Sequence, residues 1–303
     1  MISYAQNQED VVLSRLLTIV PVGRFIDVGA AHPIVHNVTY SLYLEGWRGV
    51  NVEPMAREAA MLRATRPDDQ TMQVAVGAEP GRITLYEAPL ENRGATTADL
   101  ALVERYRREG QTFKAFDVEV TTLDSIFRSS GGEVHLLKID VEGAEAAVLA
   151  GANLAVHRPW VLVIEATGPN STTDSSEVWE PDVLSVGYTL VLFDGLNRFY
   201  VRDDLPQVAR LLSVPANVFD DWRSVETANL EAEIERLVEA SRIALEASRI
   251  ALEAASGHVR DSEERALGAE EYVGTVVRRA EIAEEYALSL QTELRRLTGV
   301  PDA

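Results

Sequence analysis

The sequence predicts a doubly wound α/β domain with a mostly parallel sheet, followed by a separate helical extension. Over the first 222 residues, short apolar runs rich in Val, Ile and Phe alternate with helical patterns. Those runs are apolar almost throughout, which is typical of parallel strands buried on both faces by helices. Near residue 223 the composition changes, and Ala, Glu, Arg and Leu dominate the remainder. We therefore expect two domains, residues 1–222 and 223–303.

The predicted sheet has seven strands. In chain order they are 24–29, 49–54, 71–77, 133–140, 159–166, 187–193 and 198–202. The helical patterns lie around 8–18, 33–46, 55–65, 96–109 and 143–155. The last two strands follow each other without an intervening helix, which favours an antiparallel hairpin at the edge of the sheet. Two further strand-like pieces, 82–88 and 113–123, interrupt the pattern after the third strand.

The C-terminal extension contains a seven-residue repeat. The segment ASRIALE at 240–246 recurs unchanged at 247–253. A period of seven is typical of left-handed coiled coils. One possible seam includes Ile234, Val238, Ser241, Leu245, Ser248 and Leu252. We expect a helical hairpin or coiled coil through which the protein forms a homo-oligomer, and a solvated helical extension is the alternative.

Composition excludes several classes of function. The chain has 48 acidic and 28 basic residues and a net charge of −20, so it repels polyanions and we expect no nucleic-acid partner. It has no cysteine, which excludes disulfides, thiolate metal sites and cysteine nucleophiles. The N-terminal segment has acids where a signal peptide has bases, and its apolar stretches are too short for a membrane span. We expect a cytoplasmic protein.

Polar residues gather where the first two predicted strands end. In FIDVGAAHP (25–33) a buried strand ends at Asp27, and Gly29 permits a tight turn towards a helix near His32. The next strand ends at Glu53, where an acid in such folds holds the ribose of NAD or of S-adenosylmethionine. The alternatives are a purely structural turn and an ordinary surface carboxylate.

A third cluster follows the fourth predicted strand, in LLKIDVEGAEAAVLAGA. That strand has Lys138 and Asp140 on one face, with Glu142 at the turn. Charged groups at the end of a buried strand are costly unless they pair or contact a ligand. One alternative is an ion pair of Lys138 with Asp140 or Glu142 that caps the helix. Another is a divalent cation such as Mg²⁺, held by Asp140, Glu142 and Glu165.

Five segments in a fixed order resemble the FkbM-type methyltransferases. They are SYAQNQEDVVL at 3–13, FIDVGAAHP at 25–33, LYLEGWRGVNVEP at 42–54, VTTLDSIF at 120–127 and LLKIDVEGAEAAVLAGA at 136–152. The resemblance covers roughly residues 3–202 and leaves out the extension. It implies a Rossmann-like class I methyltransferase fold and S-adenosylmethionine as cofactor. It also implies methyl transfer to a hydroxyl of a carbohydrate, such as a surface glycan, or of a secondary metabolite.

The resemblance also assigns roles to individual residues. The cofactor-binding residues that it implies are Gln6, Asp27, Gly29, Ala30, Glu53, Pro54, Val76 and Asp140. Methyl transfer to a hydroxyl needs a group that accepts its proton. The catalytic candidates are Asp140, Lys138, Glu142 and His32. Asp140 is the favoured base, with Lys138 stabilising a developing alkoxide or fixing the carboxylates.

Two other functions stay open. A nicotinamide-dependent oxidoreductase would share the fold and Glu53, although Ala30 and Ala31 interrupt the usual glycine spacing. A catalytically inactive scaffold would recruit partners through its coiled coil. The presence of Asp27, Glu53 and Asp140 together counts against the scaffold.

Overall fold

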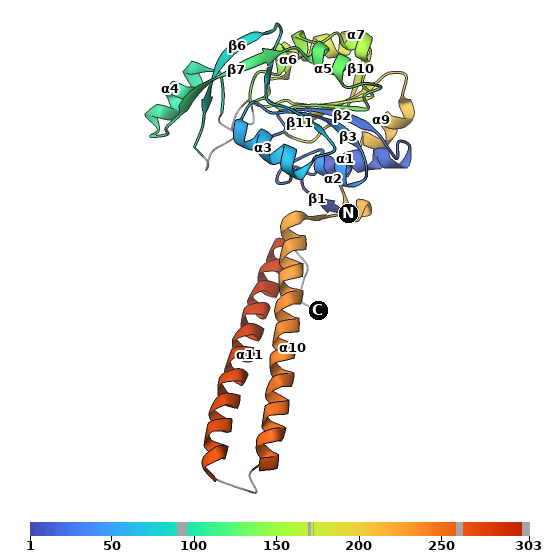
Figure 1. The fold of residues 1–303 in the computed structure, drawn as a ribbon. Helices are drawn as coiled ribbons and strands as arrows, with labels where there is room; N and C mark the ends of the chain where they lie inside the picture. The colour runs from blue at the N-terminus through green and yellow to red at the C-terminus, as the bar shows by residue number, and fades with distance from the viewer. Residues whose placement is uncertain (90–95, 169–170, 172, 259–262, 299–303) are drawn as a thin grey trace. The chain divides into compact units, whose positions relative to one another are not determined.

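The structure is a computed structural model that describes residues 1–89, 96–168, 171, 173–258 and 263–298. The chain divides into two compact units, and the boundary falls between Trp222 and Arg223 (Figure 1). The first unit is a mixed α/β domain with a mostly parallel sheet. The second consists almost entirely of two long helices.

The main sheet of the first unit has the strand order β10-β11-β9-β8-β2-β3-β4. Its strands are β2 (Arg24–Val28), β3 (Arg48–Val52), β4 (Gln70–Met72), β8 (Leu136–Ile139), β9 (Val161–Glu165), β10 (Tyr188–Phe193) and β11 (Asn197–Arg202). The ladders from β4 to β9 are parallel, whereas β11 pairs antiparallel with both β9 and β10. The carboxyl ends of β3, β2, β8 and β9 therefore meet at one edge, beside the start of β11.

Helices cover both faces of this sheet (Figure 1). They are α1 (Glu9–Ser14), η1 (Arg15–Thr18), α2 (Tyr40–Leu44), α3 (Ala56–Thr65), α5 (Leu123–Ser129), α6 (Glu145–Ala150), α7 (Leu154–His157), α8 (Glu180–Ser185) and α9 (Pro206–Leu212). Short elements elsewhere are β1 (Ile2–Ser3), η3 (Ser176–Val178), η4 (Val218–Asp220) and β12 (Arg223–Ser224).

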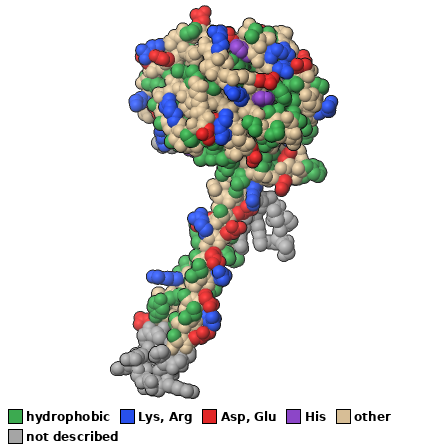
Figure 2. Space-filling model, turned by 45° about the vertical axis from the view of Figure 1, so that its right-hand side comes forward, with side chains coloured by type: hydrophobic (Ala, Val, Ile, Leu, Met, Phe, Trp, Pro, Cys, Tyr) green, Lys and Arg blue, Asp and Glu red, His purple; other side chains and the backbone are tan. Residues whose placement is uncertain are grey.

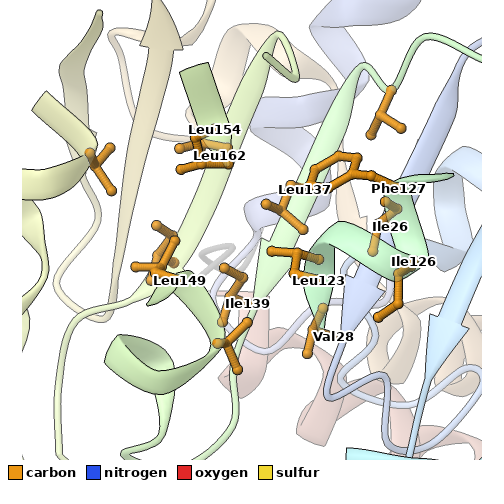
Figure 3. Close-up of a cluster of buried hydrophobic side chains, with 14 of the residues drawn as sticks. Ile26, Val28, Leu123, Ile126, Phe127, Leu137, Ile139, Leu149, Leu154 and Leu162 are labelled. Carbon is orange, nitrogen blue, oxygen red and sulfur yellow. The ribbon is translucent and has the colours of Figure 1, made fainter. Parts of the chain in front are cut away.

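One face of the sheet is apolar along its length. Figure 3 shows strand side chains of this cluster, such as Ile26, Leu137 and Leu162, together with Leu123 and Phe127 of α5. The alternate strand residues point to the other face, where Phe25, Leu136, Val161 and Val163 pack with residues of α1, η1, α2 and α9. On this second face the apolar residues give way to polar ones towards the carboxyl edge. That change positions the candidate site.

Several predicted elements differ from the structure, among them the helix 143–155, which is the two helices α6 and α7. The predicted strand 71–77 is two strands, because after Met72 the chain leaves the main sheet and β5 (Ala75–Val76) pairs with β7 (Lys114–Thr121). β7 also pairs with β6 (Gly81–Glu87), which gives a separate three-stranded sheet, and α4 (Leu100–Arg108) lies in the connection between β6 and β7.

The predicted helix 33–46 is reduced to α2. The backbone N–H groups of Ile34 and Val35 donate to the ring nitrogen Nδ1 of His32 at 3.1 and 2.9 Å, as in a turn. Side-chain hydrogen bonds of this kind compete with helix formation. The segment between β2 and α2 is therefore a structured loop.

The second unit is a hairpin of α10 (Val225–His258) and α11 (Glu263–Thr298). Its buried seam includes Ile234, Ser241 and Ser248 from α10, which face Ala280 and Ala287. The Ser241 hydroxyl donates to the carbonyl of Ala280 at 3.4 Å. The other seam candidates, Val238, Leu245 and Leu252, are exposed. Figure 2 shows hydrophobic side chains on the visible surface of the hairpin. No helix in the described part of the chain is long and apolar enough to cross a membrane.

Candidate active site

Five residues form a row across the carboxyl edge of the main sheet. In spatial order they are Glu53, Gly29, Asp140, Glu165 and Asn197. The Gly29 N–H donates to the carbonyl of Val52 at 3.0 Å, and the Asp140 N–H donates to that of Val28 at 3.1 Å. The strand ladder thus continues one residue beyond the strands. We call these five residues the edge row.

The turn after β2 brings the backbone very close to the end of β8. Gly29 has a φ of +79°, and a Cβ placed on it would lie 1.8 Å from the carbonyl oxygen of Asp140. A side chain therefore does not fit here. Two residues later Ala31 has a φ of +50°, a conformation that is costly for a residue with a side chain. Backbone strain of this kind is often found at functional sites.

Glu53 holds this turn from the neighbouring strand. Its Oε2 accepts the N–H of Ala31 at 2.8 Å, and its Oε1 accepts the N–H of Met55 at 2.8 Å. Burial raises the pKa of the carboxyl to about 7. Each oxygen retains one acceptor position after these bonds. The adjacent Pro54 is half-buried.

Lys138 lies on β8, two residues before Asp140, and connects the ends of β2 and β8. Its Nζ donates to the carbonyl of Gly29 at 2.8 Å and lies 3.3 Å from a carboxylate oxygen of each of Asp27 and Asp140. Burial acts to lower the pKa of Lys138, but the carboxylates of Asp140 and Asp27 outweigh it and hold the pKa above its usual value. The ammonium therefore stays charged, hydrogen-bonded to the Gly29 carbonyl and paired with two carboxylates. The sequence alternative of a Lys138–Asp140 pair is present, and Asp27 is a second partner that no pattern indicated.

A buried network behind Asp27 fixes the loop after β2. The Thr39 hydroxyl donates to Asp27 at 2.7 Å and accepts from the fully buried Arg66 at 3.1 Å. Arg66 also donates to the side-chain oxygen of Asn37 at 3.1 Å. The Asn37 amide in turn donates to the carbonyls of Ala30 and His32 at 2.9 and 3.1 Å. Arg66 was not singled out in the sequence, because it follows a helix and precedes no strand-end motif.

The geometry does not favour His32 as a base. Its Nδ1 accepts two backbone N–H groups, so the neutral ring carries its proton on Nε2. A nitrogen that already carries a proton cannot accept another from an acceptor hydroxyl. His32 thus stabilises the loop by accepting two hydrogen bonds, and a catalytic role for it stays a prediction.

Acidic side chains crowd around the middle of the edge row. The Asp140 side chain is 38% exposed. Burial, Asp140 and Glu145 raise the pKa of Glu142 to about 8. Burial and the nearby Asp140, Glu142 and Glu145 raise the pKa of Glu165 to about 10, and Glu165 shares a hydrogen bond with Asp140. Glu165 is therefore a neutral acid at pH 7.

The predicted Mg²⁺ site is not supported. In the part of the chain that the structure describes, no three His, Asp or Glu side chains are grouped so that they could hold a metal ion. Asp140, Glu142 and Glu165 are near enough to affect one another's pKa, but they are not grouped as the ligands of a metal ion.

The N-terminal segment lies beside the last member of the edge row. Asn197 donates from its amide to Glu9 Oε1 at 2.6 Å, and the Asn7 amide donates to the carbonyl of Asp194 at 3.2 Å. Gln6 itself is exposed. Val76, one of the expected cofactor-binding residues, lies in β5, outside the main sheet that contains Glu53 at the end of β3. The role of Asn197 was missed, because it depends on the register of β11 against β9.

The fold is of the doubly wound α/β class, in which ligands bind at the carboxyl edge of the strands, and the edge row occupies that edge here. Among protein-family models, the Methyltransferase FkbM domain matches residues 27–197. All five residues of the edge row fall within that match, which spans more than half of the chain. The chain belongs to the FkbM methyltransferase family. No curated protein matches it.

Proposed function

We propose that the protein transfers a methyl group from S-adenosylmethionine to a hydroxyl group of a carbohydrate or secondary metabolite. The observation that carries the proposal is the order of the edge row, in which Gly29 separates Glu53 from Asp140. Along this edge, the carboxyl of Glu53 can accept ribose hydroxyls. The backbone turn at Gly29 comes next, and the carboxylate of Asp140 follows it. This order suits a nucleoside cofactor that extends from Glu53 across the turn towards an acceptor near Asp140.

The residues present fit such a cofactor. The carboxyl of Glu53 has one acceptor position left on each oxygen, which matches two adjacent ribose hydroxyls. The Gly29 turn has no side chain and exposes its backbone at the centre of the row. Gln6, Ala30, Pro54 and Val76 remain further proposed contacts, and the position of Val76 is the least favourable of them. Once bound, the cofactor supplies a methyl group on a positively charged sulfur.

The chain itself positions the acceptor and takes its proton. We assign the proton acceptor to Asp140, whose carboxylate is the exposed one beside Gly29. Lys138 holds this carboxylate at 3.3 Å and cannot act as a base, because Asp140 and Asp27 keep its ammonium charged. Alignment of the reacting groups and removal of the proton are the two tasks of such an enzyme. Glu142 is the second carboxyl near this position and the other candidate for the proton acceptor.

Calorimetric titration of S-adenosylhomocysteine into the wild type and Glu53→Ala tests the proposal. Wild-type binding that weakens by about tenfold or more in the variant is expected, because two charge-assisted hydrogen bonds are lost. Glu119→Ala, an exposed acid on β7, is the control and should bind as the wild type. Absence of wild-type binding would contradict the proposal and favour the scaffold. Binding of NADH in its place would favour the oxidoreductase.

A further inference from the structure

Three polar side chains adjoin at one end of the edge row, on the far side of Gly29 from Glu53. Ile139 pairs with Ile164 in the β8–β9 ladder, so Asp140 lies beside Glu165. Asn197 pairs directly with Glu165 in the β9–β11 ladder. Side chains at paired positions point to the same face of a sheet. Asp140, Glu165 and Asn197 therefore form a continuous polar row, in which Asp140 is exposed and the other two are buried.

Glu165 has fewer hydrogen bonds than its burial requires. It is 8% exposed, and its Oε2 meets no N–H or hydroxyl donor among the described residues. Burial and the nearby carboxylates of Asp140, Glu142 and Glu145 raise the pKa of Glu165, so its carboxyl holds a proton. Buried polar atoms in folded proteins are normally satisfied, so this oxygen is suited to a donor that a ligand brings.

The surroundings select the charge of that ligand. Asp140, Glu142 and Glu145 all act on Glu165 with the same sign. The neighbouring cation, Lys138, is already bound to Asp27, Asp140 and a backbone carbonyl. A phosphate or carboxylate placed here would be repelled by these carboxylates. Lys138 could not offset the repulsion, because it already pairs with Asp27 and Asp140. A hydroxyl group has no such penalty and donates to a carboxyl oxygen.

We propose that Glu165 and Asn197 form the acceptor subsite and that it takes an uncharged polyhydroxyl compound, such as a sugar ring, in preference to an anionic one. The inference rests on the proposed function, because it names the acceptor of the same reaction. Glu165 accepts a hydroxyl of the acceptor at Oε2, the oxygen that meets no donor among the described residues. Asn197 is held in place by its 2.6 Å bond to Glu9, so the end of the subsite is fixed before the acceptor binds.

Saturation-transfer NMR with a matched pair of probes tests this subsite. Methyl glucoside and methyl glucuronide differ in one carboxylate and are each added to the protein with S-adenosylhomocysteine present. We expect saturation transfer to the glucoside and none to the glucuronide. Glu165→Ala should weaken glucoside binding about tenfold, because a buried hydrogen bond is lost. Glu165→Gln, which stays neutral and still donates to Asp140, should bind within about threefold of the wild type.

Glu119→Ala is again the control, and circular dichroism verifies that each variant is folded. Equal or stronger binding of the glucuronide, failure of the glucoside to bind, or an unchanged Glu165→Ala variant would each overturn the inference. A parallel titration with S-adenosylhomocysteine separates the two proposals. If the cofactor product binds and the glucoside does not, the subsite assignment alone is wrong. If neither binds, the proposed function is wrong as well.

Discussion

Lys138 connects the backbone of Gly29 to the side chain of Asp140, because its ammonium donates to the first at 2.8 Å and pairs with the second at 3.3 Å. These two residues are neighbours in the edge row. One buried cation thus holds together the proposed cofactor turn and the proposed base. It does so without lying in the row itself.

Lys138→Met should strongly destabilise the fold. The substitution keeps the length of the side chain but leaves Asp27 buried beside no cation. Removal of one partner of a buried ion pair costs about 3 kcal/mol or more. Urea unfolding measures the loss. Arg128→Met, which breaks an exposed pair with Asp124, is the control and should cost about 0.5 kcal/mol at most. Equal losses in the two variants would contradict a buried role for Lys138.

Gly29→Ala should impair cofactor binding far more than a matched glycine substitution. The new methyl group would meet the Asp140 carbonyl at 1.8 Å, so the turn must move. Gly46 has a φ of +94° with nothing within 4 Å of its built Cβ. Gly46→Ala therefore carries the backbone strain, about 1 kcal/mol, without the collision. We expect titration with S-adenosylhomocysteine to show near-normal affinity for Gly46→Ala and a loss for Gly29→Ala. Similar affinities would argue against the turn as the binding element.

Stability should fall as the pH rises from about 4.5 towards 7. Burial raises the pKa of Glu53 from 4.5 to about 7, so the folded state holds a proton that the unfolded chain has released. This contribution, at most about 3 kcal/mol, is complete below pH 4.5 and is lost as the pH passes 7. Glu53→Gln should reduce the slope of thermal stability against pH. Part of the slope should remain in this variant, because burial also raises the pKa of Glu9 to about 7. An unchanged slope would show that Glu53 is ionised throughout this range.

The hairpin of α10 and α11 should associate with a second copy of itself. Ile243 and Ile250 recur seven residues apart and are 58% and 55% exposed, outside the hairpin's own seam. Large apolar side chains in a periodic exposed stripe are typical of an interaction surface. Light scattering should show that Ile243→Glu with Ile250→Glu lowers the molecular mass. The control places the same charges at Arg242 and Arg249, which are exposed about 100° round the helix from the isoleucines, and should leave the mass unchanged. A wild-type monomer would refute self-association.

The strand ends were predictable and the interactions between them were not. Asp27, Glu53, Asp140 and Glu165 each close an apolar run, and the parallel pattern places such ends at one edge of a sheet. The pattern could not indicate that Asp27 faces inward to Lys138, because either a ligand or an ion pair relieves the same desolvation cost.

Other features depend on contacts between distant segments. Arg66 and Asn197 act through partners that lie 29 and 188 residues away in the chain, Asn37 and Glu9. Local periodicity carries no signal for such pairs. The coiled-coil pattern shows the same limit: Ile234 and Ser241 are buried as the repeat suggests, but Leu245 is exposed. A heptad indicates which residues share a stripe without specifying what covers them.

The edge row also sets a scale for the reaction. Adjacent strands in a sheet are about 4.8 Å apart, so Glu53 and Glu165, three strand spacings from each other, are separated by roughly 14 Å. Backbone hydrogen bonds fix this length, and the loops beyond the edge do not. The sheet thus fixes the spacing between the proposed cofactor contact and the proposed acceptor contact. Changes in the surrounding loops would alter which molecule enters while the spacing between the proposed ribose contact and the proposed acceptor contact stays constant.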